Sequence, residues 1–247
     1  MVLREIYARS ILSKSQVFDY VVNPYIGCQH NCVYCYARFM RRFTRHKEPW
    51  GEFVDVKINA LALLKHEIDK RPPGRVWVSG ECDPYQPLET TYELTRRSLE
   101  ILIQYGWPIT VQTKSPLVLR DIDLLRRNDK VEVGLSVTTA DDGVRKLFEP
   151  GAPPIKERIE ALEELRLANI RTYAMIAPML PGAERLADQL NGKVDYVLVD
   201  RMNYHYGDWV YRKHHLEYAM SHDFFFSKGK ELASAFTEQG IECRVLF

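Results

Sequence analysis

Six short apolar segments, each followed by a helical pattern, constrain what this chain of 247 residues can fold into. The segments are rich in Val, Ile and Tyr and are bounded by Gly, Pro, Asn or Asp, which is typical of strands. They occupy residues 20–26, 75–79, 109–113, 131–138, 171–178 and 194–199. Several are apolar at nearly every position, as strands that are covered on both faces tend to be.

Helical patterns lie between and after these segments, at residues 58–70, 91–105, 154–169 and 226–239, and a last short strand pattern, IECRVLF, ends the sequence. Strands that alternate with helices of this length form a parallel sheet with right-handed crossovers. Six units are too few for a closed eight-fold barrel. We therefore expect an α/β fold, an open partial (β/α)6 barrel with outer helices, whose functional face lies at the C-terminal ends of the strands.

The sequence has no internal repeat or linker, so we expect one domain over residues 1–247, with a cap region at about 200–247. The formal net charge of +1 gives no global field for nucleic acid or an anionic membrane. No run approaches about 18 apolar residues, and the first residues, MVLREIYARS, carry charges where a signal peptide needs an apolar core. We expect a cytoplasmic protein that does not enter membranes.

Three of the five cysteines, Cys28, Cys32 and Cys35, form a C-x3-C-x2-C array. An odd cysteine count in a cytoplasmic chain argues against a disulfide framework, and the clustering indicates metal chemistry. Iron–sulfur clusters are usually held by four thiolates, so a loop that supplies three to a 4Fe–4S cubane leaves one iron open to another ligand. The alternative is zinc, with His30 completing a Cys3His set. Against it, the chain has no second short pair of such ligands.

With Tyr34 before the third cysteine, this array resembles the signature of the radical S-adenosylmethionine (SAM) superfamily. Further segments resemble its spore photoproduct lyase-like family, often labelled DNA repair photolyases: NPYIGCQHNCVYCYAR (23–38), SGECDPYQPLE (79–89), LTRRSLE (94–100), TKSPLVLRDIDLL (113–125) and EPGAPPIKERIEALEEL (149–165). The resemblance implies a radical-SAM barrel, a 4Fe–4S cluster on the three cysteines and SAM as ligand of the open iron. It also implies reductive cleavage of SAM to a 5′-deoxyadenosyl radical that abstracts hydrogen from a substrate.

The same resemblance implies roles for four further side chains. Tyr34 and Tyr36 are similar to residues that line the cluster loop and touch the adenosyl group. Lys114 is similar to a lysine that contacts the cofactor, and Ser136 to a serine near the ribose. Both lie at predicted strand ends, which face the pocket of a barrel. The alternatives are a solvated loop position for Lys114 and a hydroxyl bonded to backbone for Ser136.

The segment after the second predicted strand carries two carboxylates and a cysteine. In the superfamily a turn at this place holds the methionine ammonium group, and Glu81 or Asp83 could do so here through a charge-assisted pair. Asp83-Pro84 also favours an ordinary β-turn. Cys82 lies near the place where spore photoproduct lyases carry a hydrogen-donating cysteine, which implies a hydrogen donor or radical partner. The alternative is a small buried hydrophobe, the commoner fate of a free Cys.

Two regions bear on the partners. Basic and aromatic residues interleave over 38–47, which suits a phosphate backbone with stacked bases, the acidic surface of a flavodoxin or ferredoxin, or a solvated helix face. Polar aromatic residues gather over 203–215, where a substrate-facing loop or a packed cap would lie. We expect a radical enzyme, with lyase-type repair or modification of a nucleic-acid base as the first hypothesis. A peptide or small metabolite as substrate, and a zinc-stabilised nucleic-acid-binding module without activity, are the alternatives.

Overall fold

A sheet of eight strands runs through the computed structural model, which describes residues 1–247. Its order is β11 (Glu242–Val245), β10 (Tyr196–Val199), β9 (Arg171–Ile176), β8 (Val131–Ser136), β7 (Ile109–Thr113), β6 (Val76–Val78), β3 (Tyr20–Val22) and β2 (Leu12–Lys14). Every neighbouring pair is parallel except β2 with β3. The six predicted strands therefore form six successive parallel neighbours, β3 to β10, and the predicted α/β partial barrel is confirmed.

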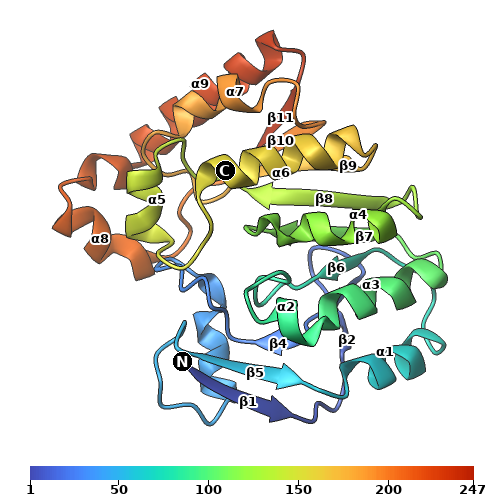
Figure 1. Ribbon diagram of the computed structural model, residues 1–247. Coiled ribbons are helices and arrows are strands. Elements are labelled where there is room, and N and C mark those ends of the chain that lie inside the picture. Colours follow the sequence, from blue (N-terminus) through green and yellow to red (C-terminus); the bar gives the residue numbers. More distant parts are fainter.

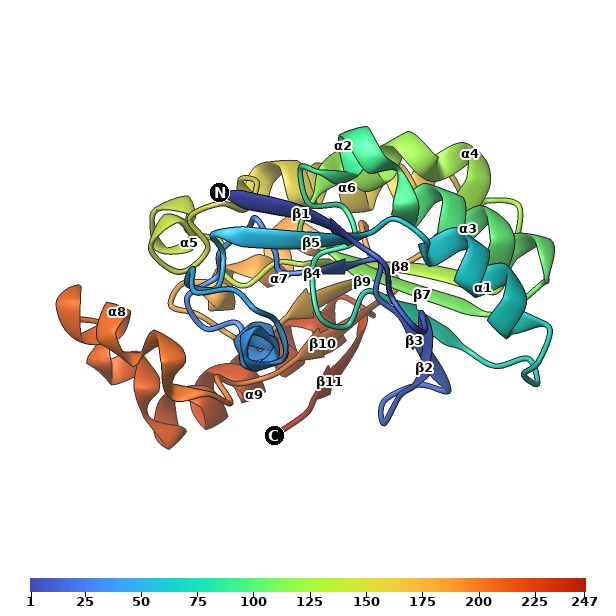
Figure 2. The ribbon, with the colours of Figure 1, turned by 90° about the horizontal axis from the view of Figure 1, so that it is seen from below.

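Crossover helices cover one face of this sheet, as Figure 2 shows for α1 (Ala60–Ile68), α3 (Leu94–Gln104), α4 (Ile122–Leu125) and α6 (Ile155–Leu167). Alternate strand residues such as Val111 and Val133 point into the apolar core beneath these helices. Toward the C-terminal edge, α9 (His222–Glu238) packs on β11 and on α7 (Leu186–Leu190). No helix combines the length and the apolar character that crossing a membrane requires.

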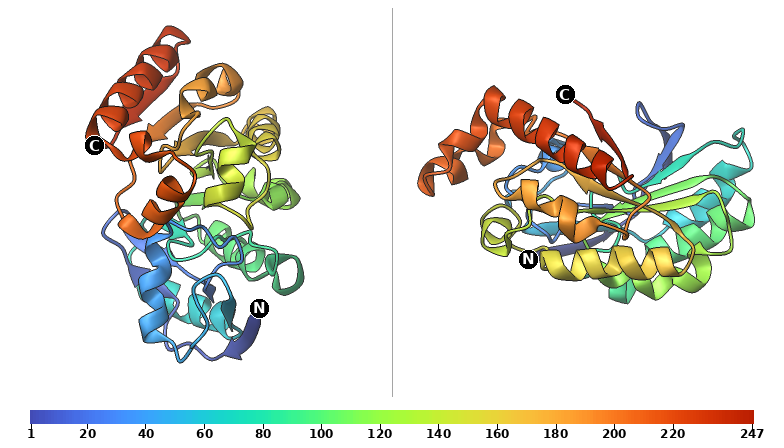
Figure 3. Two further views of the ribbon diagram at one scale, coloured as in Figure 1. Left: turned by 90° about the vertical axis from the view of Figure 1, so that its left-hand side faces the viewer. Right: turned by 90° about the horizontal axis from the view of Figure 1, so that it is seen from above.

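The carboxyl ends of the parallel strands point toward a layer of short elements. In Figure 1 the arrowhead of β8 points toward the side on which α5 (Asp142–Phe148) and α8 (Asp208–Lys213) lie. The 3-10 helix η1 (Tyr36–Phe43), drawn in blue, lies on the same side, and the left view in Figure 3 shows it beside the orange segment that contains α8. Loops from distant parts of the chain thus meet at one end of the barrel.

The first predicted strand, residues 20–26, is wrong as a single element. It divides into β3 and β4 (Tyr25–Ile26), and β4 belongs to a second, three-stranded sheet of order β1 (Val2–Ile6), β5 (Phe53–Lys57), β4. Pro24 between them has no N–H for a ladder hydrogen bond, which explains the break. The chain therefore leaves the large sheet just before the loop that carries Cys28, Cys32 and Cys35 (the cysteine loop). No sequence pattern predicted the small sheet, and its Phe53 packs in one apolar cluster with Cys28.

Candidate functional site

One cavity of about 950 Å³ lies against the sheet face opposite the crossover helices. Its lining comes from the cysteine loop, the loop after β6, the ends of β7 and β8, and the segment after β10. All ten side chains predicted for the site line this cavity: Cys28, Cys32, Tyr34, Cys35, Tyr36, Glu81, Cys82, Asp83, Lys114 and Ser136. Of the polar aromatic region, Asn203 and Tyr204 line it too, whereas Tyr211 is buried against Phe148 at 4.7 Å between ring centroids.

The cysteine loop begins at a residue that only glycine can occupy. Gly27 has φ +96°, and a Cβ there would lie 2.3 Å from the carbonyl oxygen of Phe53 in β5. Cys28 and Cys32 are buried, Cys35 is half-buried, and none of the three is in a disulfide. The loop therefore presents three reduced, desolvated thiols to one cavity.

The donor set of three thiols from one loop suits a cubane with one open iron. No three His, Cys, Asp or Glu side chains are placed to hold one metal ion. The ligands of tetrahedral zinc must converge on one point at about 2.0–2.3 Å, whereas three cubane thiolates each bind a different iron. His30, the alternative fourth zinc ligand, has its Nδ1 3.3 Å from Oδ2 of Asp83.

The two candidate carboxylates differ in how many partners the protein already gives them. Asp83 accepts hydrogen bonds from the backbone N–H of Lys114 at 2.7 Å, from the backbone N–H of Tyr85 at 2.9 Å, and from the hydroxyl of Thr113. Burial opposes its ionisation, but His30 and these donors outweigh burial and lower the pKa of Asp83 to about 2. Asp83 is thus saturated, and it ties the loop after β6 to β7 and to the cysteine loop.

Glu81 is the carboxylate that is left without a partner. Its side chain makes no hydrogen bond or ion pair, and its backbone N–H donates to Oδ1 of Asn23 at 3.1 Å. Burial raises the pKa of Glu81, and Lys57 opposes this only in part. A partly buried carboxylate without a cation is stabilised by an incoming ammonium group. Of the two sequence candidates, Glu81 is therefore the one available to a ligand.

Cys82 lies beside the cysteine loop, packed in the same apolar cluster as Cys28 and Cys35. Its Sγ is 3.6 Å from the carbonyl oxygen of Tyr25 and 3.6 Å from Oγ of Ser79. Burial raises the pKa of Cys82 to about 12. At neutral pH the side chain is therefore a thiol with its hydrogen in place, which is the form that a hydrogen-atom donor needs.

A buried carboxylate that sequence reasoning did not single out organises the other side of the loop. Glu149 accepts a hydrogen bond from the Tyr34 hydroxyl, and its Oε1 lies 3.9 Å from Nζ of Lys114. Its Oε2 lies 2.6 Å from Nη2 of Arg158 on α6. Burial opposes its charge, but Arg158 and Lys114 lower the pKa of Glu149. Lys114 is thus not a solvated loop lysine; it is held over the cavity, 5.8 Å from the centre of the Tyr34 ring.

The remaining two predicted residues, Tyr36 and Ser136, are each held by hydrogen bonds to other segments. The Tyr36 hydroxyl donates to the carbonyl oxygen of Gly80, so this ring bridges the cysteine loop and the loop after β6. The Ser136 hydroxyl accepts a hydrogen bond from the Gln112 side chain at 3.4 Å, and its carbonyl accepts from Arg158 at 2.9 Å. Ser136 therefore keeps its own hydroxyl hydrogen for a ligand.

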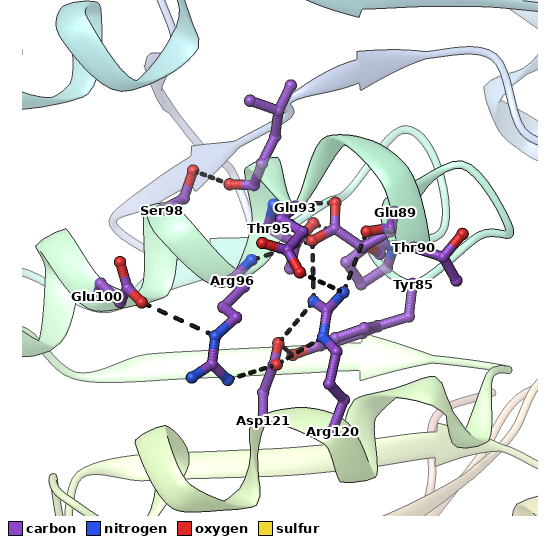
Figure 4. Close-up of polar contacts among 12 residues, drawn as sticks. Tyr85, Glu89, Thr90, Glu93, Thr95, Arg96, Ser98, Glu100, Arg120 and Asp121 are labelled. Carbon is purple, nitrogen blue, oxygen red and sulfur yellow. Dashed lines mark hydrogen bonds and ion pairs between the residues drawn. The ribbon is translucent and has the colours of Figure 1, made fainter.

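Behind the loop after β6 lies the buried polar network of Figure 4. Arg120 contacts Glu89 at 3.2 Å and Asp121 at 2.8 Å, Arg96 contacts Asp121 at 2.8 Å, and the Tyr85 hydroxyl donates to Asp121 at 3.0 Å. These residues come from three of the segments that carry the family resemblance. Buried charges require such pairing, so the three segments act as one support that fixes the loop. The sequence motifs contain these charged residues, but the sequence does not show that they contact one another.

Comparison with known proteins agrees with this geometry. A family model described as Radical SAM superfamily matches residues 22–185. An uncharacterized protein of Methanocaldococcus jannaschii is 40% identical over 162 residues, which are 66% of this chain and 61% of that protein. A protein of Pseudomonas phage M6 named radical SAM Nα-GlyT isomerase is 27% identical over 164 residues, 66% of this chain and 33% of its own length.

Among solved structures, a spore photoproduct lyase complexed with dinucleoside spore photoproduct has a similar fold. Its TM-score is 0.72 at 16% identity, over 99% of this chain and 82% of that chain. At this identity the likeness concerns the fold alone. This chain spans about 61% or less of the length of the two curated relatives described above.

Proposed function

The chain belongs to the radical SAM superfamily, and we propose that it is a radical SAM enzyme that acts on a damaged or modified nucleic-acid base held in the 950 Å³ cavity. The observation that supports radical SAM chemistry in this cavity is the meeting of three reduced thiols, one unpartnered carboxylate and one neutral thiol on its wall. Its volume lies near the upper end of ligand pockets, about 300–1,000 Å³, and leaves room for a cofactor and a second small group.

The roles of the chain's residues follow from their contacts. Cys28, Cys32 and Cys35 are the ligands of a 4Fe–4S cluster, and Glu81 binds the ammonium group of SAM. When bound, the cluster and SAM would supply a 5′-deoxyadenosyl radical, with an electron from a flavodoxin or ferredoxin. The protein itself contributes position and the exclusion of water.

The other cavity residues orient the ligand and return hydrogen. Tyr36, Lys114 and Ser136 present a hydroxyl, an ammonium group and a second hydroxyl to the same space, which suits an adenosine moiety. Cys82 keeps its S–H bond at neutral pH, so it can return a hydrogen atom to a substrate radical. The loss of that atom would leave a thiyl radical on Cys82, which one electron from the flavodoxin or ferredoxin donor and one proton would return to the thiol.

A nucleic-acid base is favoured over a peptide or metabolite by two observations. The cavity opens beside η1, whose arginines form no ion pairs. The solved spore photoproduct lyase of similar fold is complexed with dinucleoside spore photoproduct. A base that leaves its stack carries a flat face and a polar edge, which fit a pocket lined by Tyr and polar side chains.

Anaerobic incubation with dithionite and SAM, followed by assay of 5′-deoxyadenosine, tests the reaction type. The reconstituted protein is expected to form it, and Cys32→Ala should abolish its formation. Cys243→Ala, which removes a thiol on β11 outside the cavity, is the matched control and should form it at the wild-type rate. Full activity in Cys32→Ala would show that the cluster assignment is wrong.

The substrate is tested separately, by adding thymine-dimer DNA, a peptide library or a metabolite panel to the same reaction. We expect the DNA alone to accelerate 5′-deoxyadenosine formation and to be altered in mass. Acceleration by a peptide or metabolite, with the DNA unchanged, would overturn the substrate proposal and leave the reaction type intact.

A further inference from the structure

A row of stacked tyrosines leads out of the cavity. Tyr36 and Tyr204 both line the cavity, with ring centroids 6.3 Å apart and planes 23° apart. Tyr204 in turn stacks on Tyr206, at 5.8 Å and 3°. Arg38 lies over the Tyr206 ring, its Cζ 4.8 Å from the centroid. We call Tyr36, Tyr204 and Tyr206 the aromatic row; its inner end is fixed to the cavity wall by the bond from Tyr36 to Gly80.

The aromatic row is exposed to solvent, which is unusual for three near-parallel rings. Tyr36 is 40% exposed, Tyr204 48% and Tyr206 39%. Large apolar surface that the fold leaves in water in a contiguous patch commonly marks a binding site. Rings whose centroids are 5.8–6.3 Å apart cover one another only in part, so some ring surface of each tyrosine stays open, and another flat π-system can pack against it.

A strongly basic hollow lies directly beside the row. A second cavity of about 470 Å³ is lined by Arg38, Phe39, Arg41, Arg42, Thr44 and His46, with no carboxylate among them. Within residues 36–48 the only ion pairs are those of His46 with Glu48 and Asp55, so the arginines of this segment are unpaired. Arg38 also has a buried Nε without a hydrogen-bond partner. Arg41 donates a hydrogen bond to the carbonyl oxygen of Lys47, and Arg42 lies over the rings of Phe39 and Phe43, so both side chains are positioned while their charges stay uncompensated. In a chain of net charge +1, this concentration of positive charge is local.

The two features come from segments far apart in sequence that the fold brings together. Figures 1 and 3 show the blue helix η1 beside the orange segment after β10, which includes η4 (His205–Gly207) and α8. Gly207 lies against Val33 and Tyr34 of the cysteine loop. The basic hollow, the aromatic row and the cavity therefore form one continuous path, from charge through stacking to the reacting site.

We propose that this path binds a single-stranded segment of nucleic acid, with its phosphates on Arg38, Arg41 and Arg42 and its unpaired bases against the aromatic row. The inference rests on the proposed function and specifies the form of its substrate. Stacking on tyrosine requires a base whose face is free, which a duplex does not offer. An acidic electron-donor protein could form ion pairs with the arginines, but its carboxylates would not stack on the tyrosine rings.

Fluorescence anisotropy of labelled 15-nucleotide oligo(dT) and oligo(U), against a duplex of equal length, tests the path on the reconstituted protein. Both single strands are compared so that DNA and RNA are distinguished. We expect tighter binding of a single strand than of the duplex. Tyr204→Ala should weaken single-strand binding about tenfold, the usual range for one lost base–aromatic stack. Arg41→Ala with Arg42→Ala should flatten the salt dependence by about 0.7 in log–log slope for each lost phosphate contact.

Tyr7→Ala and Arg126→Ala make the same changes at exposed positions outside the path and should leave binding unchanged. Equal affinity of wild type and Tyr204→Ala, or preference for duplex, would overturn the inference. So would an Arg41→Ala, Arg42→Ala variant that binds oligonucleotide normally but loses flavodoxin-driven, and not dithionite-driven, 5′-deoxyadenosine formation. That result would assign the arginines to the electron donor. Because the anisotropy titrations measure binding without turnover, their results are independent of whether the base is the reacting group.

Discussion

Arg158 and Glu149 form a fully buried ion pair, in which Nη2 of Arg158 lies 2.6 Å from Oε2 of Glu149 and both side chains are 0% exposed. Glu149 also accepts the Tyr34 hydroxyl hydrogen bond, and the neighbouring backbone N–H of Gly151 donates to the carbonyl of His30 at 3.0 Å. A Cβ at Gly151 would lie 2.4 Å from the carbonyl oxygen of Gln29. The start of the EPGAPP segment thus presses directly on the cysteine loop.

Glu149→Gln tests this support. The change leaves Arg158 buried without its counter-charge, which typically costs about 3–5 kcal/mol of the free energy of unfolding. Urea unfolding measures the loss, and Glu164→Gln on the exposed face of α6 is the control, expected within about 0.5 kcal/mol of wild type. If Glu149→Gln lowered the free energy of unfolding by less than about 1 kcal/mol, the ion pair would not be what stabilises the cysteine loop.

Substitution of Cys82 tests whether the cluster has three cysteine ligands, which leaves one iron open, or four. Because we assign only three cysteines as ligands, Cys82→Ala should keep about four irons per chain after reconstitution, whereas Cys28→Ala should lose the cluster. Iron analysis and the visible absorption of the reconstituted variants measure this. Iron loss in Cys82→Ala would make Cys82 the fourth ligand and remove the open coordination position.

Glu81 and Asp83 should respond differently to the same chemical change. Glu81→Gln removes the unpartnered carboxylate, so we expect the dissociation constant for SAM to rise about tenfold with little change in unfolding free energy, since a hydrogen bond to a charged group contributes roughly 1.5–3 kcal/mol. Asp83→Asn should instead destabilise the fold, because an amide cannot accept from three donors and His30 together. Calorimetric SAM titration and urea unfolding separate the two effects. If Asp83→Asn weakened SAM binding and Glu81→Gln destabilised the fold, Asp83 would be the SAM-binding carboxylate and Glu81 the structural one.

The low pKa of Asp83 predicts an acid dependence of stability. Its pKa is about 2 in the folded protein, against about 3.9 in an unfolded chain. Ionised Asp83 therefore stabilises the fold by about 2–3 kcal/mol above pH 4, and this is lost as the pH falls toward 2. In iron-free protein, the difference in unfolding free energy between wild type and Asp83→Asn should shrink by about 1 kcal/mol from pH 6 to pH 3. If this difference in unfolding free energy were the same at pH 6 and pH 3, the partners of Asp83 would not lower its pKa in the folded protein.

Several features of the fold and site were predictable because they are local in the chain. Strand and helix periods depend on neighbouring residues, so the six parallel strands were found and α6 lies at Ile155–Leu167, within two residues of its predicted bounds. The C-x3-C-x2-C spacing limits how three thiols can be presented, and the strand ends that carry Lys114 and Ser136 follow from barrel topology. All ten predicted side chains consequently line one cavity.

Other features depend on which distant side chains meet, and sequence carries no measure of that. Glu81 and Asp83 are two residues apart and chemically alike, yet only Asp83 is saturated, because the end of β7 and His30 reach it and not its neighbour. Arg158 lies on the stripe of α6 that a helical pattern assigns to apolar residues, and it is tolerated there because Glu149 neutralises it. The sequence thus determined the elements and the donor types, whereas the tertiary structure decided which charges are paired. The physical reason is that ionic partnership depends on distances of a few ångströms between segments that only the folded sheet brings together.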